Sequence, residues 1–491
     1  MRVLHVSSEL APFAQSGGLG DVVAGLPAAQ AELGLEPAVL VPLYRGVAAR
    51  AAAAGCMLEA APLTIEIGGH RFDAVLRHAR VGRVRCGFLD VPALYDRDGG
   101  LYGPGGTAEF GDNHLRFGVL GAAALAAGRL LLGGVDVLHA HDWQGGAAAI
   151  YAHLARVSAS PDAGALSIVT TIHNLAFRGI FGKHVMSELG LPWSLFTAAQ
   201  LEFYDQVSFL KGALALSDAV TTVSPTYAQE ILTPERGEGL DGFLRWEVRR
   251  IAGIVNGIDV VAWNPATDPA LPARYSLAQL AGKRACRAAL AAEAGLAAPG
   301  DAAADDQAPL IGVISRMSGQ KGLDLIAEVA PALGALGAKL VVLGTGDPAL
   351  EARFTHLAHE FPAHVAVRIG FDVAYARRIY GGCDLFAMPS RFEPCGLGQL
   401  YAMRYGAVPI VHAVGGLRDT VINVGAAGGT ATGIRFDEPT PRALYAALER
   451  AVALYRDRDA FAQLQRGAMA RNSSWTVPAH EYVQLYRSVR P

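Results

Sequence analysis

The stretch Ile311-Gly-Val-Ile-Ser-Arg-Met-Ser-Gly-Gln-Lys-Gly322 decides the fold of the second half of the chain. The apolar run 310–314 predicts a buried strand, a short loop follows it, and an amphipathic helix is expected from about Leu323. Lys321 would then lie at the N-terminal end of a helix, where the helix dipole disfavours a cation. An anion bound by the free backbone N–H groups removes this conflict. The stretch therefore predicts a strand–loop–helix unit that binds phosphate.

Two cations of this loop suit a diphosphate. Arg316 offers a planar fork for two phosphate oxygens, and Lys321 offers a compact charge. The alternative is that both are solvated cations on a surface loop. The strand–loop–helix context favours the phosphate interpretation.

A second glycine-rich element lies near the start of the chain. Residues 1–7 are expected to form a strand, and Gln15-Ser-Gly-Gly-Leu-Gly-Asp21 then opens a helix. Glycines in such a loop let the backbone approach a ligand closely and leave N–H groups free. Turns of this kind also occur for packing alone, so the element carries weight only together with the rest of the chain.

Short apolar runs alternate with helical patterns twice along the sequence. The expected strands are 3–7, 37–41, 135–140, 167–172 and 219–223 in the first half, and 310–315, 339–344, 365–369, 385–389 and 408–411 in the second. Strands that are apolar throughout and separated by helices indicate parallel sheets covered on both faces. The fold class is therefore α/β, with two Rossmann-like, doubly wound domains that face each other across a cleft. A β-rich insertion at 63–89 carries a hairpin signal at Gly68-Gly69.

Domain limits follow from the positions of these two series. We expect an N-terminal domain at 1–254 with the inserted hairpin, and a C-terminal domain at 255–473 that starts in the turn-rich segment 254–259. Residues 474–491 are expected to form a helix that returns to the first domain, with Tyr482, Leu485, Tyr486 and Val489 on one face. The polar, Ala-rich stretch 291–307 is expected to be a surface loop.

Composition limits the classes of function. The 491 residues suggest two or three domains, and 52% hydrophobic with 18% charged residues is typical of a soluble globular protein. The formal net charge of −3 argues against nucleic acid or an anionic membrane as partner. Five scattered cysteines without a CxxC pair suit reduced thiols, and the apolar stretch 117–128 is too short to span a membrane. We expect a cytoplasmic protein; its oligomeric state cannot be predicted from the sequence.

Polar side chains lie at the ends of two neighbouring predicted strands of the first half. His139-Ala-His-Asp-Trp143 comes after the third strand of the first half, and His173 closes the fourth. The two histidines beside an aspartate could bind a metal, but no further ligands follow at metal spacing. Asp142 could instead accept hydrogen bonds from sugar hydroxyls, with Trp143 offering an apolar face, or it could cap the next helix.

The segment 389–399 follows a strand of the second half. Glu393 precedes Pro394, which suits a fixed turn, and Gly396–Gln399 would open a helix whose N–H groups can contact phosphate. Glu393 is either a surface carboxylate or a ligand for sugar hydroxyls. Asp-x-Asp pairs, which hold divalent cations in some transferases, occur at Asp96/Asp98 in a loop and at Asp457/Asp459, expected within a helix. Neither follows a nucleotide-binding strand, so we expect no essential metal.

Taken in order, these motifs resemble one family over nearly the whole chain. They are Ser16-Gly-Gly-Leu-Gly-Asp21, Tyr95-Asp-Arg97, His139-Ala-His-Asp-Trp143, Thr171-Ile-His-Asn174, Val223-Ser-Pro-Thr226, Asn256-Gly257, Ser315-Arg316, Gln320-Lys-Gly322 and Arg391-Phe-Glu-Pro-Cys-Gly396. The pattern resembles the bacterial glycogen synthases, which are retaining, ADP-glucose-dependent starch/glycogen synthases with the GT-B fold. The resemblance implies transfer of glucose from ADP-glucose to the non-reducing end of an α-1,4-glucan, with retention and without metal or cofactor. The alternatives are a noncatalytic glucan-binding or regulatory homologue and a related GT-B transferase that uses UDP-glucose.

The resemblance also implies roles for residues and domains. It assigns the acceptor side to the first domain and the nucleotide sugar to the second. The catalytic set would be Asp142, His173, Arg316, Lys321 and Glu393. Donor-binding residues would be Gln15, Ser16, Gly17, Gly18, Asn256, Arg316, Lys321, Cys395, Gly396, Leu397 and Gly398, and acceptor- or sugar-binding residues would be Tyr95, Asp142, Trp143 and His173. Arg316 and Lys321 would hold the diphosphate, Glu393 the donor glucose, and His173 its 6-hydroxyl side.

Two positions depart from the family pattern. Gln15-Ser16 stands where the family usually has Lys-Thr, and Gly398 stands where it often has Thr. The first change removes a donor-binding cation, and the second removes a hydroxyl but keeps backbone N–H donors. A sugar diphosphate needs stabilisation of its leaving group more than a strong nucleophile. We favour front-face attack by the glucan hydroxyl, and a double displacement stays open.

Overall fold

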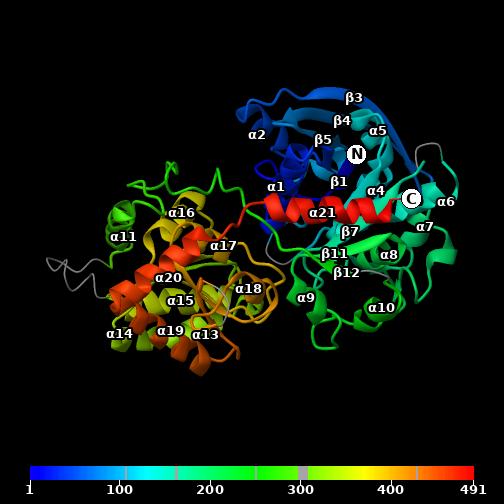
Figure 1. Ribbon diagram of the computed structural model, residues 1–491. Coiled ribbons are helices and arrows are strands. Elements are labelled where there is room, and N and C mark those ends of the chain that lie inside the picture. Colours follow the sequence, from blue (N-terminus) through cyan, green and yellow to red (C-terminus); the bar gives the residue numbers. More distant parts are fainter. Residues whose placement is uncertain (106–107, 161–163, 249–250, 297–307, 427–429, 491) are drawn as a thin grey trace. The chain divides into compact units, whose positions relative to one another are not determined.

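The computed structural model describes residues 1–105, 108–160, 164–248, 251–296, 308–426 and 430–490 (Figure 1). The chain divides into two compact units, which are described one at a time below. The first comprises Met1–Gly257 together with Trp475–Pro491, and the second comprises Ile258–Ser474.

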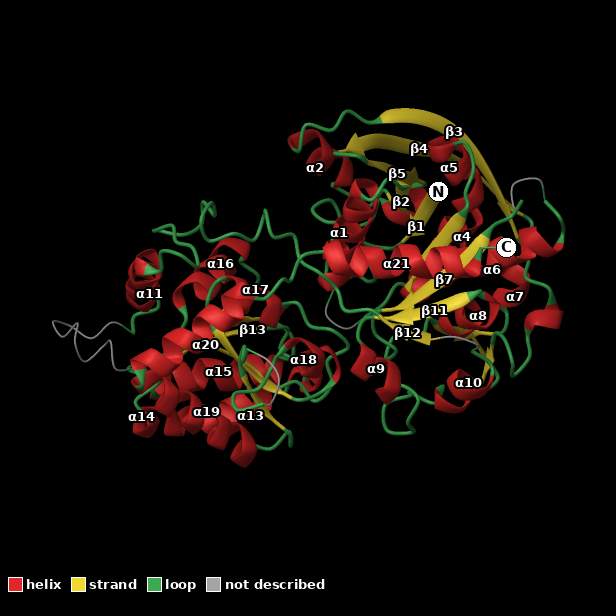
Figure 2. Cartoon of the chain, viewed as in Figure 1, coloured by secondary structure: helices red, strands yellow, loops and turns green. Residues whose placement is uncertain are grey.

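Within the described residues, the first unit is built on a nine-stranded sheet with the order β12-β11-β7-β6-β1-β2-β5-β4-β3 (Figure 2). Seven strands are parallel: β1 (Arg2–Val6), β2 (Glu36–Pro42), β5 (Val84–Asp90), β6 (Val137–His141), β7 (Ser167–Ile172), β11 (Ala219–Thr222) and β12 (Ile251–Gly253). The predicted hairpin at Gly68-Gly69 is confirmed, because it joins β3 (Glu59–Ile67) to β4 (His70–Val81). Both strands of the hairpin extend this edge of the main sheet in antiparallel fashion.

The C-terminal helix α21 (Thr476–Val489) belongs to the core of the first unit. It packs against α1 (Gly18–Glu32), and Figure 1 shows the two helices side by side. Tyr482, Leu485 and Tyr486 are buried, with Val489 partly buried beside them, as the helical pattern predicts. These side chains share one hydrophobic cluster with Val3 of β1 and residues of the neighbouring strands. The sheet of the first unit is therefore covered on this side by the two ends of the chain.

The second unit has a six-stranded sheet with the order β15-β14-β13-β16-β17-β18 among the residues described. Its strands are β13 (Leu310–Ile314), β14 (Lys339–Gly344), β15 (Val365–Ile369), β16 (Leu385–Met388), β17 (Val408–His412) and β18 (Ile434–Phe436), all parallel. Numbered within the unit, this order is 3-2-1-4-5-6, that of a doubly wound nucleotide-binding fold. Hydrophobic clusters lie on both faces, as expected for a parallel sheet covered by helices.

The strand order reverses once in each unit, and ligands of such folds bind at the carboxyl ends of the strands beside that point. In the second unit the reversal lies between β13 and β16, which are hydrogen-bonded neighbours. In the first unit it lies between β1 and β6. The glycine loop follows β1, Asp142 follows β6, Arg316 follows β13, and Glu393 follows β16. The chain therefore brings its distinctive motifs to the switch point of each sheet.

Several local predictions differ from the structure. The strands β12 and β18 were not predicted, nor was a small sheet made of β8 (Ile180–Gly182), β9 (Glu202–Phe203) and β10 (Gln206–Ser208). Helix α11 (Ala281–Glu293) covers the start of the loop expected at 291–307, and 297–307 lie outside the described residues. Asp457 does not lie within a helix: it follows α19 (Pro441–Arg456), and its side chain caps α20 (Arg458–Ala470) by accepting from the amide of Ala460.

No single helix in the described ranges is both long and apolar enough to cross a membrane. Two consecutive helices, α4 (Asn113–Ala122) and α5 (Ala124–Leu132), reach that length and composition together, with a bend of 41° between them.

Candidate functional site

The loop after β13 carries Arg316 and Lys321. Lys321 ends a short 3-10 helix, Gly319–Lys321, and α13 (Leu323–Val329) starts two residues later. Gly322 joins them with a φ of 64°, and a Cβ atom there would lie 2.2 Å from the carbonyl oxygen of Pro389. Glycine thus allows the left-handed turn and lets this loop lie directly on the loop after β16.

Lys321 has an anionic partner within the chain. Its Nζ atom lies 2.7 Å from Oε2 of Glu393, and the Ser390 hydroxyl donates to the same oxygen at 2.9 Å. Glu393 is only 5% exposed, while the lysine side chain is partly exposed. Lys321 therefore has a neutralising partner besides the bound anion that the sequence suggested. This partner is a carboxylate 72 residues away, and sequence spacing cannot reveal such a distant contact.

A second ion pair holds the same two loops together. Arg391 makes a bidentate contact with Asp324, at 2.7 and 2.6 Å. The amide of Arg391 also donates to the carbonyl oxygen of Gln320 at 2.8 Å. Hydrogen bonds from Arg391 lower the pKa of the Asp324 carboxyl, against the opposing effect of its burial. The loops that carry Arg316 and Glu393 are therefore fixed before any ligand binds.

Arg316 differs from its neighbours because its side chain is exposed and its guanidinium has no hydrogen bond or ion pair with the residues that the structure describes. The same loop also carries Lys321, which is already paired with Glu393. An arginine on a fixed loop at the sheet's switch point, without an internal partner, can give both arms of its guanidinium to a ligand. This is the strongest sign of an anion site in the second unit.

The turn before α17 (Gly398–Arg404) explains one departure from the family pattern. Gly396 has a φ of 73°, and Cys395 is buried while Leu397 is partly exposed. A Cβ atom at Gly398 would meet Met388 and Phe386 at 3.3 Å and the Tyr380 hydroxyl at 3.4 Å. Since neighbours fill this space, a threonine would require them to shift. The glycine matches the packing of this chain.

Glu9 organises the glycine loop of the first unit. Its buried carboxylate accepts hydrogen bonds from the amides of Ser16, at 2.9 Å, and Gly17, at 3.2 Å, and from the Ser16 hydroxyl. The hydroxyl of Tyr102 donates to it at 2.6 Å. Sequence reasoning missed Glu9, although a carboxylate just after β1 and before a glycine loop is a usable signal. Gly18 opens α1 directly after this loop.

Gln15 is held by the start of the helix that follows it. Its Nε2 atom donates to Oδ2 of Asp21 at 2.8 Å and to the carbonyl oxygen of Gly17 at 3.1 Å. The side chain is exposed and folds back over the glycine loop. The side-chain amide of Gln15 therefore contacts the first turn of α1. Position 15 is where the family usually has a lysine.

Asp142 joins the ends of two strands. It starts α6 (Asp142–Val157) with a φ of 52°, which is unusual for a residue other than glycine. Its Oδ1 atom accepts from the amide of His173 at 2.7 Å and from that of Asn174 at 3.3 Å. The carboxylate thus bonds to the end of β7 and does not cap its own helix, as the alternative interpretation required.

The environment of Asp142 favours its neutral form. Burial raises the pKa of its carboxyl to about 7, and the two backbone hydrogen bonds oppose this shift. Neither Oδ2 of Asp142 nor Nδ1 of His173 has a hydrogen-bond partner in the described part of the chain. Strained backbone and free polar atoms at a strand end are typical of functional sites.

His173 is also the outer end of a chain of hydrogen bonds. Its Nε2 lies 2.9 Å from Nδ1 of His141, whose Nε2 lies 3.0 Å from Nδ1 of His5. His5 Nε2 contacts Oε1 of Gln30 at 2.9 Å, and Gln30 Nε2 contacts the Tyr486 hydroxyl at 3.0 Å. The Tyr486 hydroxyl in turn contacts Nδ1 of His139 at 2.7 Å. His139 Nε2 contacts Oγ1 of Thr171 at 2.5 Å, and that oxygen contacts Oγ1 of Thr221 at 2.6 Å.

These contacts bear on the metal interpretation of the histidines. Ligand atoms of His5, His139 and His141 lie within 4.8 Å of one another. Burial lowers the pKa of all three rings, that of His5 to about 4, so each is neutral near pH 7. Both nitrogens of each ring already have a hydrogen-bond partner, so the arrangement fits a hydrogen-bond chain better than a metal site. Asp96 and Asp98 both contact Arg45, so that pair of carboxylates is also engaged.

Three predicted ligand residues are buried. The indole of Trp143 is only 4% exposed and packs edge-on against Phe117 and Phe181, so it offers no face to a sugar. Tyr95 is likewise buried, and its hydroxyl donates to the carbonyl oxygen of Arg116 at 2.7 Å. Both positions argue against direct sugar binding and for a packing role. Asn256 is buried with an Oδ1 atom that has no partner among the described residues.

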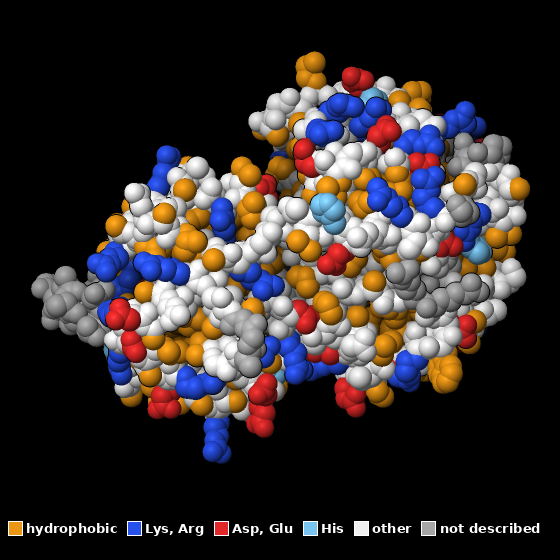
Figure 3. Space-filling view, in the orientation of Figure 1, with side chains coloured by type: hydrophobic (Ala, Val, Ile, Leu, Met, Phe, Trp, Pro, Cys, Tyr) orange, Lys and Arg blue, Asp and Glu red, His pale blue; other side chains and the backbone are white. Residues whose placement is uncertain are grey.

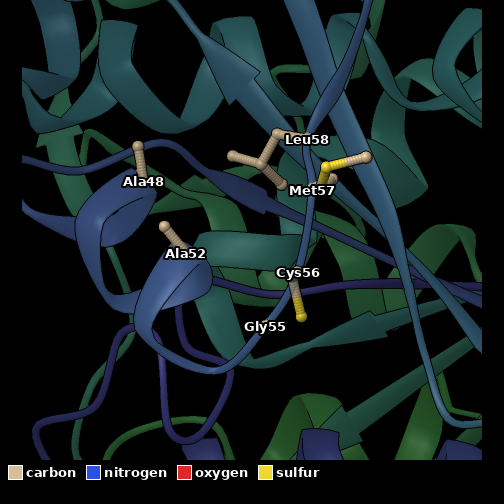
Figure 4. A pocket seen from close by; sticks show the side chains of 6 residues that line it. All are labelled: Ala48, Ala52, Gly55, Cys56, Met57 and Leu58. Carbon is tan, nitrogen blue, oxygen red and sulfur yellow. The ribbon is translucent and has the colours of Figure 1, made fainter.

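Two open hollows of the surface are lined by other residues. One is lined by Ala48 and Ala52 of α2 (Val47–Ala53) and by the segment 55–58, and none of these side chains carries a charge (Figure 4). The face drawn in Figure 3 mixes basic and acidic side chains without a large area of one sign. The charged and hydrogen-bonding groups at the two switch points are therefore better site candidates than these hollows.

Comparison with known proteins identifies the family. A model of the starch synthase catalytic domain matches residues 2–246, and one of glycosyl transferases group 1 matches residues 298–466. A glycogen synthase of Anaeromyxobacter dehalogenans (strain 2CP-C) is 46% identical over 492 residues, covering 100% of both chains. This chain belongs to the glycogen synthase family. Another member, from Acidiphilium cryptum (strain JF-5), is 45% identical over 100% of this chain and 99% of its own.

Solved structures agree with this membership of the glycogen synthase family. The catalytic domain of starch synthase IV from Arabidopsis thaliana, bound to ADP and acarbose, is 32% identical with a TM-score of 0.89 and covers 99% of each chain. Sucrose-phosphate synthase from Thermosynechococcus elongatus, at 18% identity and a TM-score of 0.60, shares the fold. The predicted GT-B class is confirmed, and the protein is a glycosyltransferase.

Proposed function

We propose that this glycogen synthase family member transfers glucose from ADP-glucose to the non-reducing end of an α-1,4-glucan in the cytoplasm, with retention of configuration. The observation that carries the proposal is the exposed Arg316 guanidinium, without a partner among the described residues, on the loop that also carries Lys321 of the Lys321–Glu393 ion pair at the switch point of the second unit. The starch synthase IV structure was solved with ADP and acarbose, a nucleoside diphosphate and a sugar-like inhibitor. Free thiols at all five cysteines suit a reducing compartment.

In this proposal the cations of the second unit stabilise the leaving ADP. Arg316 binds the diphosphate with both arms of its guanidinium, and Lys321 adds a charge beside it. Because both lie on loops fixed by the Arg391–Asp324 pair, they need little reorganisation as negative charge develops. Glu393, held by Lys321 and Ser390, contacts hydroxyls of the donor glucose.

The first unit supplies the polar groups for the sugar and the acceptor. His173 takes the 6-hydroxyl side of the donor glucose through its free Nδ1 atom, and Oδ2 of Asp142 positions the reacting groups. The glycine loop, held by Glu9, packs against the diphosphate through Gly18. Front-face attack by the glucan hydroxyl fits these polar groups. Asp142 is buried and about half protonated near neutral pH, so it is not a fully charged nucleophile.

The direct test is incorporation of radiolabelled glucose into glycogen by the purified protein, with ADP-glucose and UDP-glucose compared side by side. We expect transfer from ADP-glucose with the higher kcat/KM. No incorporation from either donor, with glycogen still bound, would favour the noncatalytic homologue. A preference for UDP-glucose would favour the related transferase.

Activity is expected to survive exhaustive treatment with EDTA. The side chains of Arg316 and Lys321 supply the charge that a divalent cation supplies in other transferases, and Asp96 and Asp98 are engaged by Arg45. Initial rates before and after chelation, with magnesium or manganese added back, measure this. Loss of activity that magnesium or manganese restores would contradict the leaving-group assignment.

Gln15→Lys is expected to lower the KM for the donor. A lysine adds a charge-assisted hydrogen bond to the diphosphate, and about 1.4 kcal/mol of added binding corresponds to roughly a tenfold lower KM. If the contact is equal in ground and transition states, kcat changes little. Steady-state kinetics with both nucleotide sugars measure the effect.

The neighbouring Asp21 provides the control for this experiment. It accepts from Gln15 at 2.8 Å and could capture the new ammonium group. The Asp21→Asn/Gln15→Lys double variant removes that competitor. An unchanged KM in both variants would show that position 15 does not reach the diphosphate.

A further inference from the structure

The buried series of hydrogen bonds from His173 to Thr221 can be assigned donors and acceptors in only one way once the Gln30 amide is placed. In that assignment every polar group of the series has its partner. The Oε1 atom of Gln30 faces Nε2 of His5, and its Nε2 atom faces the Tyr486 hydroxyl. An amide oxygen only accepts and an amide nitrogen only donates. His5 must therefore carry its proton on Nε2, and its Nδ1 must accept.

The same reasoning fixes the next two rings. A neutral imidazole has one N–H and one lone pair. Because Nδ1 of His5 accepts, His141 donates from Nε2 and accepts on Nδ1. His173 then donates from Nε2 to His141, which leaves its own Nδ1 as an acceptor. The amide of Gln30, three hydrogen bonds away, thus decides the tautomer of His173.

The other arm of the chain is consistent with this direction. The Tyr486 hydroxyl accepts from Gln30 and so donates to Nδ1 of His139. His139 in turn donates from Nε2 to Thr171. Reversal of every bond would also satisfy the groups, but only if the Gln30 amide turned over. The chain therefore has two complete states, which differ in whether His173 offers a lone pair or an N–H at Nδ1.

We propose that Gln30 and Tyr486 are positioning residues that set the tautomer of His173 and make its Nδ1 a hydrogen-bond acceptor for the substrate. This inference rests on the proposed function in one respect, the contact of His173 with the donor sugar. With the Gln30 amide as it stands, Nδ1 of His173 accepts a hydrogen bond from a sugar hydroxyl. In the reversed state it would offer a proton instead.

Nitrogen NMR of the histidine-labelled, full-length protein reads the tautomer directly and needs no substrate. Two-bond nitrogen–proton spectra distinguish Nδ1–H from Nε2–H, and a His173→Asn variant assigns the signal. We expect Nε2–H at His173, His141, His5 and His139. A proton on Nδ1 of His173 would overturn the proposal.

Two substitutions at Gln30 give opposite expectations. In Gln30→Glu the carboxylate accepts from both His5 and Tyr486, so His173 keeps its tautomer while His139 must move its proton to Nδ1. In Gln30→Met nothing fixes the direction, and His173 is expected to populate both tautomers. Tyr486→Phe, which removes the other anchor of the amide, is expected to do the same and serves if Gln30→Met fails to fold. A single unchanged tautomer in both variants would refute the role of the pair.

Kinetics with a 6-deoxy-6-fluoro analogue of the donor test the consequence for the substrate, because fluorine cannot donate a hydrogen bond. With an acceptor at Nδ1, the wild type should disfavour the analogue by about tenfold in kcat/KM. The preference should shrink to about threefold or less in Gln30→Met and Tyr486→Phe. Tyr44→Phe is the matched control, since Tyr44 is a buried tyrosine of the same unit whose hydroxyl has no partner among the described residues.

The two hypotheses fail in different ways. If the wild type transfers no glucose while the tautomers behave as expected, the proposed function fails together with the sugar contact, and the role of Gln30 and Tyr486 in setting the His173 tautomer stands. If transfer is normal but Gln30→Met and Tyr486→Phe keep both the wild-type tautomer and the wild-type preference, the positioning inference fails and the function stands.

Discussion

Arg316→Ala should reduce kcat by on the order of a hundredfold or more while leaving the fold intact. Loss of one preorganised contact to a developing charge costs roughly 3 kcal/mol of transition-state stabilisation. Because the Arg316 side chain has no partner among the described residues, its removal leaves no internal group unsatisfied. Steady-state kinetics and a thermal melt on the same preparation measure both parts.

Arg353→Ala is the matched control for this variant. Arg353 is an exposed arginine of the same unit on α15 (Pro348–Glu360), away from the switch point. We expect wild-type turnover and melting temperature for this control. Near-normal turnover in Arg316→Ala would refute the assignment of the diphosphate contact.

Lys321→Ala should lose turnover to a similar extent but should also destabilise the second unit. It leaves the buried carboxylate of Glu393 with Ser390 as its remaining side-chain partner, at a cost of about 1–3 kcal/mol. Lys321→Ala/Glu393→Gln removes the unpaired charge, so it should recover stability without recovering turnover. This pattern separates the role of the lysine in catalysis from its role in the fold.

The first unit should lose stability steeply between pH 7 and pH 5. Burial lowers the pKa of His5 to about 4 and that of His173 to about 3, from 6.5. In this range the unfolded chain binds protons that the folded chain does not, so stability falls as the pH falls. Each of these histidines contributes a loss of about 2 kcal/mol by pH 5.

Other groups of the chain modify this loss. The pKa values of His139 and His141 are also lowered by burial, so both rings add to it. Asp142 opposes this loss of stability. Its carboxyl has a pKa of about 7 in the folded protein, so between pH 7 and pH 5 the folded state binds a proton that the unfolded state does not. This stabilises the first unit by about 2 kcal/mol. The net loss is a large share of the stability of a typical domain.

Urea titrations at pH 7 and pH 5, followed by hydrogen exchange in β1, β6 and β7, measure this effect. Exchange in the strands of the second unit provides the reference within the same molecule. His5→Gln should reduce the pH slope of the stability by about one proton. Equal stability of the first unit at both pH values would contradict the conclusion that its buried histidines stay neutral in the folded protein.

Much of the fold could be predicted because its signals are local. Apolar runs such as Lys339–Gly344 and Ser167–Ile172 coincide with strands β14 and β7, since a strand buried on both faces must be apolar throughout. The glycine pair at the β3–β4 turn was equally readable. Short strands such as β12 and β18 were missed because three residues carry too little pattern.

The candidate site was predictable in its residues but not in its contacts. Motif order placed Arg316, Lys321 and Glu393 at strand ends, and the strand order places those ends together. The Lys321–Glu393 pair and the hydrogen bond from Gln30 to Tyr486 join residues 72 and 456 positions apart. No periodicity spans such distances. Trp143 was misjudged because burial depends on Phe117 and Phe181, which lie in separate elements.

The position of α21 has a consequence for how the protein is made. Residues 1–257 leave the ribosome first, but the helix that completes their core follows the whole of the second unit. During synthesis the nascent first unit exposes an apolar groove beside α1, and its histidine chain has no Tyr486 to close it. The part of the chain that is synthesised first therefore cannot complete its core until the last helix has been made.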